Sequence, residues 1–216
     1  MNIFPREFLE LGITYAACIN LRRRSERWDV FHKRAQLSGF GFIPRFEAID
    51  GRNLPIPEGL RSHQGAYGCL HSHGAVYQSA LEAGHSRILV TEDDCVFTAG
   101  VAEISHYLTA TVGQFSWIHL GNPENLGVIE RRPSHIHVAG VLNTHAYVID
   151  RSLMQHYVER NALRPFPTNQ LLHADRALIW LCYRHSLRIC VPPRPLASQD
   201  KAMPRDVQWG VPAPVR

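Results

Sequence analysis

Hydrophobic positions along the chain change repeatedly from strand-like runs to helix-like spacing. Residues 13–20 form an apolar, partly β-branched run of strand length that ends in a polar residue. Ser25 is placed to cap a following helix, in which Trp28 and Phe31 lie on one face. The first part of the chain therefore predicts a strand, a loop and a helix.

The clearest helical pattern begins at Gly68. Apolar residues recur at helical spacing from Cys69 to Leu81, and Gly84 is a natural C-terminal stop. The next segment, residues 87–91, has three consecutive aliphatic residues, a pattern typical of a strand buried on both faces. We therefore expect a long helix followed directly by a central strand.

The remaining segments continue the alternation of strands and helices. They are predicted strands at 42–48, 117–120, 135–138, 145–149 and 187–191, helices at 101–112, 152–160 and 174–185, and a turn at 121–123. Such alternation predicts an α/β fold with a mostly parallel central sheet flanked by helices. We expect one domain over residues 1–216, with an N-terminal extension at 1–11 and a Pro-containing tail at 201–216.

The composition is that of a globular protein. The chain has 216 residues, of which 45% are hydrophobic and 19% charged, and this excludes a mainly disordered protein. The formal net charge of +4 suits an anionic small ligand as well as a nucleic acid, so charge alone does not choose between them.

The cysteines and the hydrophobic segments bear on localisation. The 5 cysteines are widely scattered and form no Cys-x-x-Cys pair, which argues against a disulfide framework and a structural zinc site. Residues 1–11 lack the apolar core of a signal peptide, and no window approaches the roughly 18 apolar residues of a membrane span. We expect a cytoplasmic protein, with at most a peripheral membrane contact through the basic clusters at 22–24 and 131–132.

Three consecutive carboxylates, Glu92, Asp93 and Asp94, follow the predicted central strand. Ligands of α/β sheets bind beyond the carboxyl ends of the strands, which is where this cluster falls. Like charges raise one another's pKa unless a cation compensates, and Mg²⁺ or Mn²⁺ take carboxylate oxygens together with substrate phosphates. An acidic triplet is also common as a solvated turn, so the pattern alone leaves both interpretations open.

The neighbouring polar residues of the long helix give weaker signals. His71 and His73 point about 100° apart on a helix, so they cannot jointly hold one ion. His73 shares the apolar face, where it is either a core histidine or a donor that faces a ligand. Ser72 lacks the Gly-x-Ser-x-Gly turn of an exposed nucleophile. The chain also lacks a P-loop and a Gly-x-Gly-x-x-Gly motif, which weakens kinase, ATPase and dehydrogenase interpretations.

Four short blocks follow one another in the first half of the chain. They read INLRRRSER at 19–27, AIDG at 48–51, GAYGCLHSH at 65–73 and LVTEDD at 89–94. In this order they resemble glycosyltransferase family 25, which includes bacterial lipooligosaccharide β-galactosyltransferases and collagen galactosyltransferases. Weaker similarity continues at 145–149, at Asp175 and at 195–199.

The resemblance implies a fold and an activity. The fold would be GT-A-like, and the enzyme would move a hexose, most often galactose, from a UDP-sugar to a glycan or lipid-linked saccharide. Transfer would proceed with inversion, often with Mn²⁺ or Mg²⁺, and no nucleic-acid partner is expected. Arg22 and Ser25 depart from the family pattern, in which an acidic residue and a proline are common at these positions.

The resemblance also implies roles for individual residues. The nucleotide-sugar side would be formed by Asn20, Leu21, Arg27, Asp50, Gly51, Ser72 and Asp93. Glu92 and Asp94 stand at the Asp-x-Asp metal positions, with Gln199 closing the site from the C-terminal side as a further ligand. His73 is expected to face the ligand and to take part in catalysis.

Inverting transfer needs a base for the acceptor hydroxyl and charge stabilisation on the departing diphosphate. Asp175 is our candidate base because it begins a helix after a polar loop at 164–173, although an aspartate there is also a plain helix cap. The acidic cluster and the predicted fold are also compatible with two other functions. One is a metal-dependent phosphoester hydrolase built on the acidic cluster, and the other is a non-catalytic binding protein of the same fold.

Overall fold

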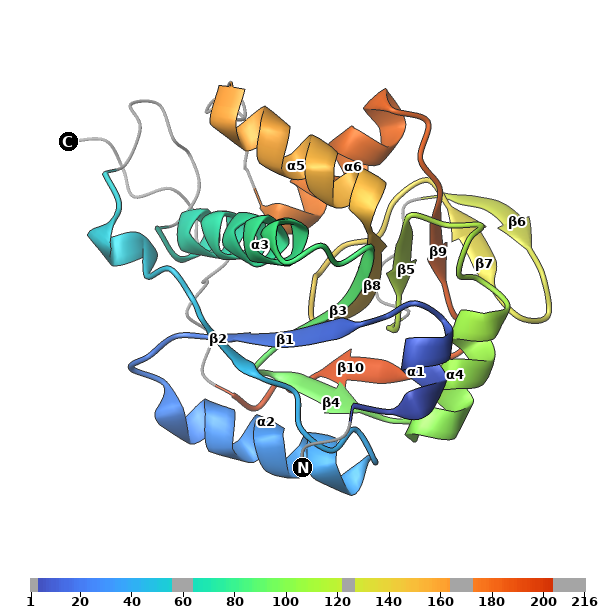
Figure 1. Cartoon of the computed structure of the whole chain (residues 1–216), viewed down its shortest axis with the longest axis horizontal. Coiled ribbons are helices and arrows are strands. Elements are labelled where there is room, and N and C mark those ends of the chain that lie inside the picture. Colours follow the sequence, from blue (N-terminus) through green and yellow to red (C-terminus); the bar gives the residue numbers. More distant parts are fainter. Residues whose placement is uncertain (1–3, 56–63, 122–126, 164–172, 204–216) are drawn as a thin grey trace.

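An eight-stranded sheet lies at the centre of the molecule, with helices on both of its faces (Figure 1). The computed structural model describes residues 4–55, 64–121, 127–163 and 173–203. The strands are β1 Tyr15–Asn20, β2 Arg45–Glu47, β3 Arg87–Glu92, β4 Cys95–Phe97, β5 Trp117–His119, β6 Val128–Arg131, β7 Ile136–Val138, β8 Ala146–Asp150, β9 Ile189–Val191 and β10 Ala197–Gln199. The helices are α1 Arg6–Glu10, α2 Ser25–Leu37, α3 Gln64–Glu82, α4 Val101–Thr109, α5 Arg151–Leu163 and α6 Ala174–Arg184, with a 3₁₀ turn η1 at Gly51–Asn53.

The sheet has the strand order β2-β1-β3-β8-β5-β9-β7-β6, and β4 and β10 form a separate antiparallel pair. The expectation of parallel strands holds for β2, β1 and β3, which alternate with helices α2 and α3 along the chain. The β6-β7 hairpin has no helix between its strands, and β8 runs antiparallel to both β3 and β5. The α/β fold is confirmed, and the sheet as a whole is mixed.

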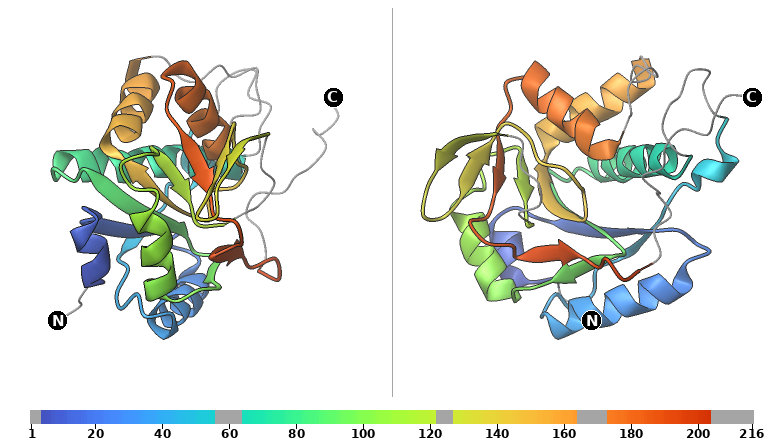
Figure 2. Two further views of the ribbon diagram at one scale, coloured as in Figure 1. Left: turned by 90° about the vertical axis from the view of Figure 1, so that its right-hand side faces the viewer. Right: turned by 180° about the vertical axis from the view of Figure 1, so that it is seen from behind.

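Two hydrophobic clusters cover the two faces of the sheet. Helices α3, α5 and α6 pack on one face, and α1, α2 and α4 pack on the other, as Figures 1 and 2 show. Ile88 and Val90 of β3 contribute to the first cluster, while Leu89 between them belongs to the second. The prediction of a strand buried on both faces is therefore confirmed for β3.

The helix predicted from Gly68 is confirmed and is longer than expected, because α3 begins at Gln64. Gly84 follows it with a φ of +81°, a left-handed conformation that favours glycine as a helix stop. The capping role predicted for Ser25 is wrong. A turn closed by the hydrogen bond from Arg24 N to Leu21 O makes Arg24 the N-cap of α2, so Ser25 already lies inside the helix.

Several short elements escaped prediction, namely α1, β4, β6 and β10. Phe8 of α1 is fully buried, so the chain joins the core inside the segment expected to be an extension. Residues 122–126, 164–172 and 204–216 lie outside the described residues, together with most of the turn, loop and tail expected there. In the described ranges, no helix has both the length and the hydrophobicity that crossing a membrane requires.

Candidate functional site

A cavity of about 490 Å³ lies beyond the carboxyl ends of β1 and β3. All the site residues expected from the sequence line it except Asn20 and His73, which contact residues that do. The expected residues in its wall are Leu21, Arg27, Asp50, Gly51, Ser72, Glu92, Asp93, Asp94, Asp175 and Gln199. The fold therefore brings residues from distant parts of the chain to one cavity.

The parallel pairing of β1 with β3 sets the position of the acidic cluster. Ile19 lies opposite Glu92 in the register, so the residues that follow both strands meet at one edge of the sheet. Asn20 donates from Nδ2 to Asp93 Oδ2 at 2.6 Å and to the carbonyl of Arg24 at 2.9 Å. These hydrogen bonds connect the turn after β3 to the loop after β1.

Arg27 supplies part of the charge that the acidic cluster requires. It lies in the first turn of α2, is 8% exposed, and forms an ion pair with Asp93. A second contact joins its guanidinium to Asp94 Oδ2 at 3.5 Å. A buried pair of this kind holds its geometry because removing either partner would leave an uncompensated buried charge. The Arg27 side chain therefore holds the middle and last carboxylates of the triplet.

Asp94 retains an oxygen that no described residue satisfies. Its Oδ2 accepts a hydrogen bond from Gln199 Nε2 at 2.9 Å, whereas its buried Oδ1 has no hydrogen-bond partner in the described part of the chain. Burial and the nearby charge of Glu92 raise the pKa of Asp94 to about 7. An unsatisfied carboxylate oxygen in the wall of a cavity fits a hard divalent cation, whose charge would favour the ionised form.

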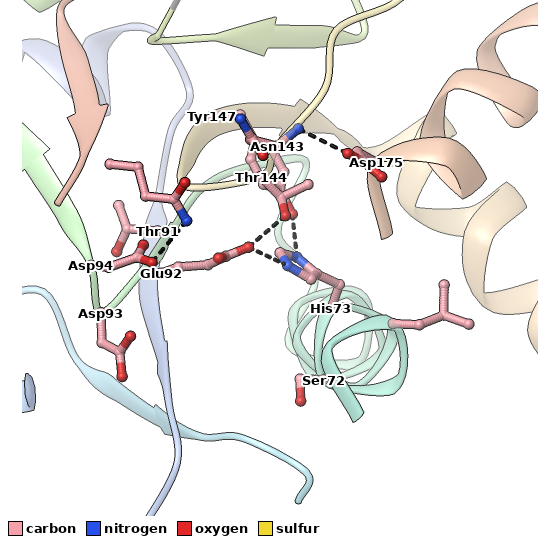
Figure 3. A network of polar contacts seen from close by, with 12 residues as sticks. Ser72, His73, Thr91, Glu92, Asp93, Asp94, Asn143, Thr144, Tyr147 and Asp175 are labelled. Atoms are coloured by element: carbon pink, nitrogen blue, oxygen red, sulfur yellow. Dashed lines mark hydrogen bonds and ion pairs between the residues drawn. The ribbon is translucent and has the colours of Figure 1, made fainter. Parts of the chain in front are cut away.

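Glu92 belongs to a separate hydrogen-bond network, drawn in Figure 3. Its Oε1 accepts hydrogen bonds from Thr144 Oγ1 and from His73 Nε2, the latter at 3.2 Å. Burial favours the neutral carboxyl, but these donors and the nearby histidines outweigh it, so the pKa of Glu92 is lowered. The ring of His73 is fully buried and also contacts Tyr147 Oη at 2.6 Å through Nδ1. His73 therefore does not face the cavity as expected, and it reaches the cavity only through Glu92.

Asp175 lies in the cavity wall at the start of α6 and is 6% exposed. Its Oδ2 accepts a hydrogen bond from Asn143 N at 2.8 Å, and its Oδ1 accepts one from Arg176 N at 2.7 Å. Asn143 has a φ of +70°, an uncommon conformation for a residue other than glycine. The carboxylate therefore fixes the backbone of the loop at Asn143 and also lines the cavity.

His119 holds the same loop from the other side. Burial and the neighbouring His145 lower the pKa of His119 to about 3, so its ring is neutral. Nδ1 accepts a hydrogen bond from Gly121 N at 2.9 Å, which leaves Nε2 to donate to the carbonyl of Asn143 at 3.1 Å. Because the loop is held in this way, the Thr144 hydroxyl can donate its hydrogen bond to Glu92.

Asn143 and Thr144 were missed as cavity residues by the sequence analysis. Because β8 is antiparallel to β3, the residues before β8 lie at the edge where β3 ends. The sequence did contain a signal for them, because Asn143 and Thr144 are a polar pair directly before the predicted strand at 145–149. A parallel arrangement of that strand would have placed this pair at the opposite edge.

The remaining wall is formed by η1 and the start of α3. Ser72 Oγ accepts a hydrogen bond from Ile49 N at 2.8 Å and donates one to Gly68 O at 2.7 Å, so it joins the two segments. Asp50 pairs with Arg52 and with Arg23, and these hydrogen bonds hold the pKa of its carboxyl well below the usual range. This wall is built from paired charges and close backbone contacts.

Comparisons with known proteins agree with the resemblance drawn from the sequence blocks. The model of glycosyltransferase family 25 (LPS biosynthesis protein) matches residues 15–129, more than half of the chain. A protein of Acanthamoeba polyphaga mimivirus that is named as a glycosyltransferase is 35% identical over 97 residues. That match covers 39% of this chain and 30% of the relative, so it spans less than one third of the relative's length.

Solved structures with a similar arrangement have low sequence identity to this chain. The crystal structure of a glycosyltransferase involved in the glycosylation of the major capsid of PBCV-1 is 10% identical with a TM-score of 0.48, over 88% of this chain and 93% of that one. The structure of apo-UDP-glucose pyrophosphorylase is 11% identical with a TM-score of 0.45, over 86% of this chain and 75% of that one. The extent of the family match is decisive: the chain belongs to glycosyltransferase family 25.

Proposed function

We propose that this protein transfers a hexose, with galactose as the first candidate, from a UDP-sugar to a saccharide or glycoconjugate acceptor. The main observation behind this proposal is that a single cavity is lined by the buried Arg27, by the acidic triplet after β3 and by Asp175. This combination provides a cationic side chain, carboxylates for a divalent cation and a further carboxylate for proton transfer. Inverting transfer needs a base for the acceptor hydroxyl and charge stabilisation on the departing diphosphate, and these groups can supply both.

The donor diphosphate is assigned to the side of the cavity formed by Arg27 and Asp94. Mn²⁺ or Mg²⁺ would be held there by Asp94 and Glu92 with the help of Gln199, and when bound it would neutralise charge on the departing diphosphate. Gln199 Nε2 fixes one oxygen of Asp94 and thereby keeps the other directed away from that hydrogen bond. Arg27 keeps Asp93 and Asp94 from moving apart, because its guanidinium contacts both carboxylates.

The nucleoside is assigned to the wall between β1 and η1. Ile19, Leu21 and Ile49 line this part of the cavity and offer apolar surface to the face of a flat base. Gly51 packs closely against α3, where any side chain would clash with the backbone of Gln64 and Gly68. The polar boundary of the same wall is Asp50 with its two arginines.

The acceptor is assigned to the side of Asp175, where this residue serves as the base. Each of its oxygens accepts one backbone hydrogen bond, and a carboxylate oxygen has a second lone pair that can receive the proton of an acceptor hydroxyl. Those two hydrogen bonds also prevent the carboxylate from rotating. A single displacement of this kind inverts the anomeric centre and needs no covalent sugar intermediate.

The proposal is tested by incubating the purified protein with UDP-hexoses and Mn²⁺ and measuring the UDP released with and without saccharide acceptors. Acceptor-stimulated release with one donor is expected, and NMR of the product before mutarotation should show an inverted anomeric configuration. UDP binding without release of UDP in any combination would favour a non-catalytic protein of the same fold. Hydrolysis of simple phosphoesters without UDP binding would favour a metal-dependent hydrolase.

A further inference from the structure

Cys69, His73 and Glu92 form a second cluster of ligand atoms in the cavity wall. The Cys69 thiol, one His73 ring nitrogen and one Glu92 carboxylate oxygen all lie within 4.8 Å of one another. Cys69 and His73 are four residues apart on α3, so they lie on one face of this helix. Glu92 approaches them from the end of β3. The three side chains therefore converge from two elements that the core holds rigidly.

We propose that these three side chains bind a thiophilic divalent cation, Zn²⁺ by the chemistry of its ligands. A thiolate and an imidazole with one carboxylate favour zinc, whereas Mn²⁺ and Mg²⁺ prefer sites made only of oxygens. In a zinc tetrahedron with Zn–N and Zn–O bonds of about 2.0–2.1 Å, a nitrogen and an oxygen ligand lie about 3.3–3.4 Å apart. His73 Nε2 and Glu92 Oε1 are 3.2 Å apart, which is close to that spacing.

The residues behind the cluster already have the arrangement that orients metal ligands. His73 Nδ1 contacts Tyr147 Oη at 2.6 Å, and this hydroxyl in turn contacts that of Tyr77. Thr144 Oγ1 donates a hydrogen bond to Glu92. Hydrogen bonds to the far side of a ligating histidine and to a ligating carboxylate fix the ligand directions. Here both are in place without a rearrangement of the backbone.

Cation binding at this site has a simple proton balance. Without the cation, His73 Nε2 carries the proton that it donates to Glu92, and Nδ1 accepts from Tyr147. With the cation, that proton resides on Nδ1 and is donated to Tyr147, and Nε2 binds the metal. The Cys69 thiol loses one proton to solvent when its thiolate binds. No oxidant or other reactant is required.

The cluster is open to the cavity on one side. Cys69 and Glu92 both line the cavity, so a fourth ligand, a water molecule or an oxygen of a bound substrate, can reach the cation from there. Glu92 is shared with the cation site proposed beside Asp94. Zinc at the cluster would therefore withdraw Glu92 from that site. The inference needs only the cavity and these side chains, and it does not depend on sugar transfer.

Thiol protection tests the proposal on the unmodified protein. Cys69 is partly exposed, whereas the other four cysteines are buried, so alkylation of the native chain should start at Cys69. We expect one equivalent of Zn²⁺ to slow iodoacetamide labelling of Cys69 at least about tenfold, as measured by peptide mass spectrometry, because the thiolate would be bound. Mn²⁺ at the same concentration should not protect it. Equal labelling with and without Zn²⁺ would overturn the proposal.

Cobalt provides a spectroscopic readout in the absence of any nucleotide. Co²⁺ at the cluster should give the charge-transfer absorption of a cobalt–thiolate bond, and this band should disappear in Cys69→Ser. Cys182→Ser is the matched control, because Cys182 is a buried cysteine of α6 that is not one of the three proposed ligands. Asp94→Asn should keep the cobalt band even if sugar transfer is lost, so this inference and the proposed function can fail separately. A band that survives in Cys69→Ser would overturn the proposal.

Discussion

Asn20 donates a hydrogen bond of 2.6 Å to Asp93, although 73 residues separate them in the sequence. Asn20 ends β1 and Asp93 directly follows β3, its parallel neighbour, so the hydrogen bond connects the chain segments that leave these two strands beside the cavity. Arg27 binds the second oxygen of the same carboxylate. Asp93 is therefore held within the protein on both oxygens, whereas Asp94 Oδ1 has no hydrogen-bond partner among the described residues.

Asp94→Asn tests the proposed cation ligand. Removing the charge with little change in shape should lower metal-dependent transfer by at least about 100-fold, because charge stabilisation of the departing diphosphate is lost. Transfer is measured by UDP release with saturating donor. Asp29→Asn, which removes an exposed aspartate from α2, is the control and should leave transfer unchanged. Full activity in folded Asp94→Asn would remove Asp94 from the cation site.

The same variant has a predicted effect on stability. The folded-state pKa of Asp94 is raised to about 7 from 3.8, so the folded protein holds a proton that the unfolded chain has lost between these pH values. Stability therefore falls as pH rises from 3.8 to about 7, because the unfolded chain ionises in this range while the folded carboxyl keeps its proton. Without metal at pH 8, Asp94→Asn should melt at the same temperature as wild type or higher. A clearly lower melting temperature would contradict the raised pKa.

His73→Gln tests a positioning role exerted through Glu92. A glutamine cannot contact Glu92 and Tyr147 together, so one buried hydrogen bond is lost and the free energy of unfolding should fall by about 1–3 kcal/mol. If His73 also orients Glu92, kcat should fall about tenfold with little change in KM for the donor. His106→Gln, on the exposed side of α4, is the control. A lowered melting temperature with normal kinetics would show that His73 contributes to the stability of the core and not to catalysis.

Asp175→Asn tests the proposed base. It should preserve binding of UDP and Mn²⁺, lower kcat strongly, and reduce transfer to a saccharide more than slow hydrolysis of the donor by water. The matched control is Asp150→Asn, because Asp150 also accepts a backbone hydrogen bond at a helix start, from Leu153 at 3.0 Å. The control should lose stability and keep transfer. Equal loss of transfer and hydrolysis would point to damage of the Asn143 loop rather than loss of a base.

Gly68→Ala tests the close contact between η1 and α3. A Cβ at this position would lie 2.5 Å from Gly51 N and 2.6 Å from Ile49 O, both of which are backbone atoms. Overpacking of this kind should lower the free energy of unfolding by about 1–3 kcal/mol in urea titrations. UDP affinity should fall too, because residues 48–51 line the cavity. Gly100→Ala, whose Cβ would meet Ser38 O only at 3.9 Å, should keep the UDP affinity of the wild type and lose only the stability that alanine costs at the N-cap of α4.

The part of the site carried by parallel strands was accessible from the sequence. The apolar runs that became β1 and β3 are long enough to be recognised, and each is followed at once by polar residues. Rules for parallel sheets then place Asn20 and Glu92 at one edge. The identity of the partner of Asp93 was not accessible, because the pairing with Arg27 depends on how α2 packs against the sheet.

The rest of the site depends on tertiary structure that local patterns do not encode. Thr144 reaches Glu92 only because β8 is antiparallel to β3. The hydrophobic pattern of a strand does not show in which direction the strand runs. β10 has three residues, too few for a periodicity, yet it carries Gln199 to Asp94. The spacing of Cys69 and His73 was visible in the sequence, but Glu92 completes their cluster only after folding.

Calorimetric titration of the purified protein with UDP, with and without Mn²⁺, tests the central claim most directly. A nucleotide-sugar site at Arg27 and Asp94 predicts one UDP bound per chain, with affinity at least about tenfold higher in Mn²⁺, and loss of this metal dependence in Asp94→Asn. Absence of UDP binding in both conditions, or the same Mn²⁺ enhancement in Asp94→Asn as in the wild type, would contradict it.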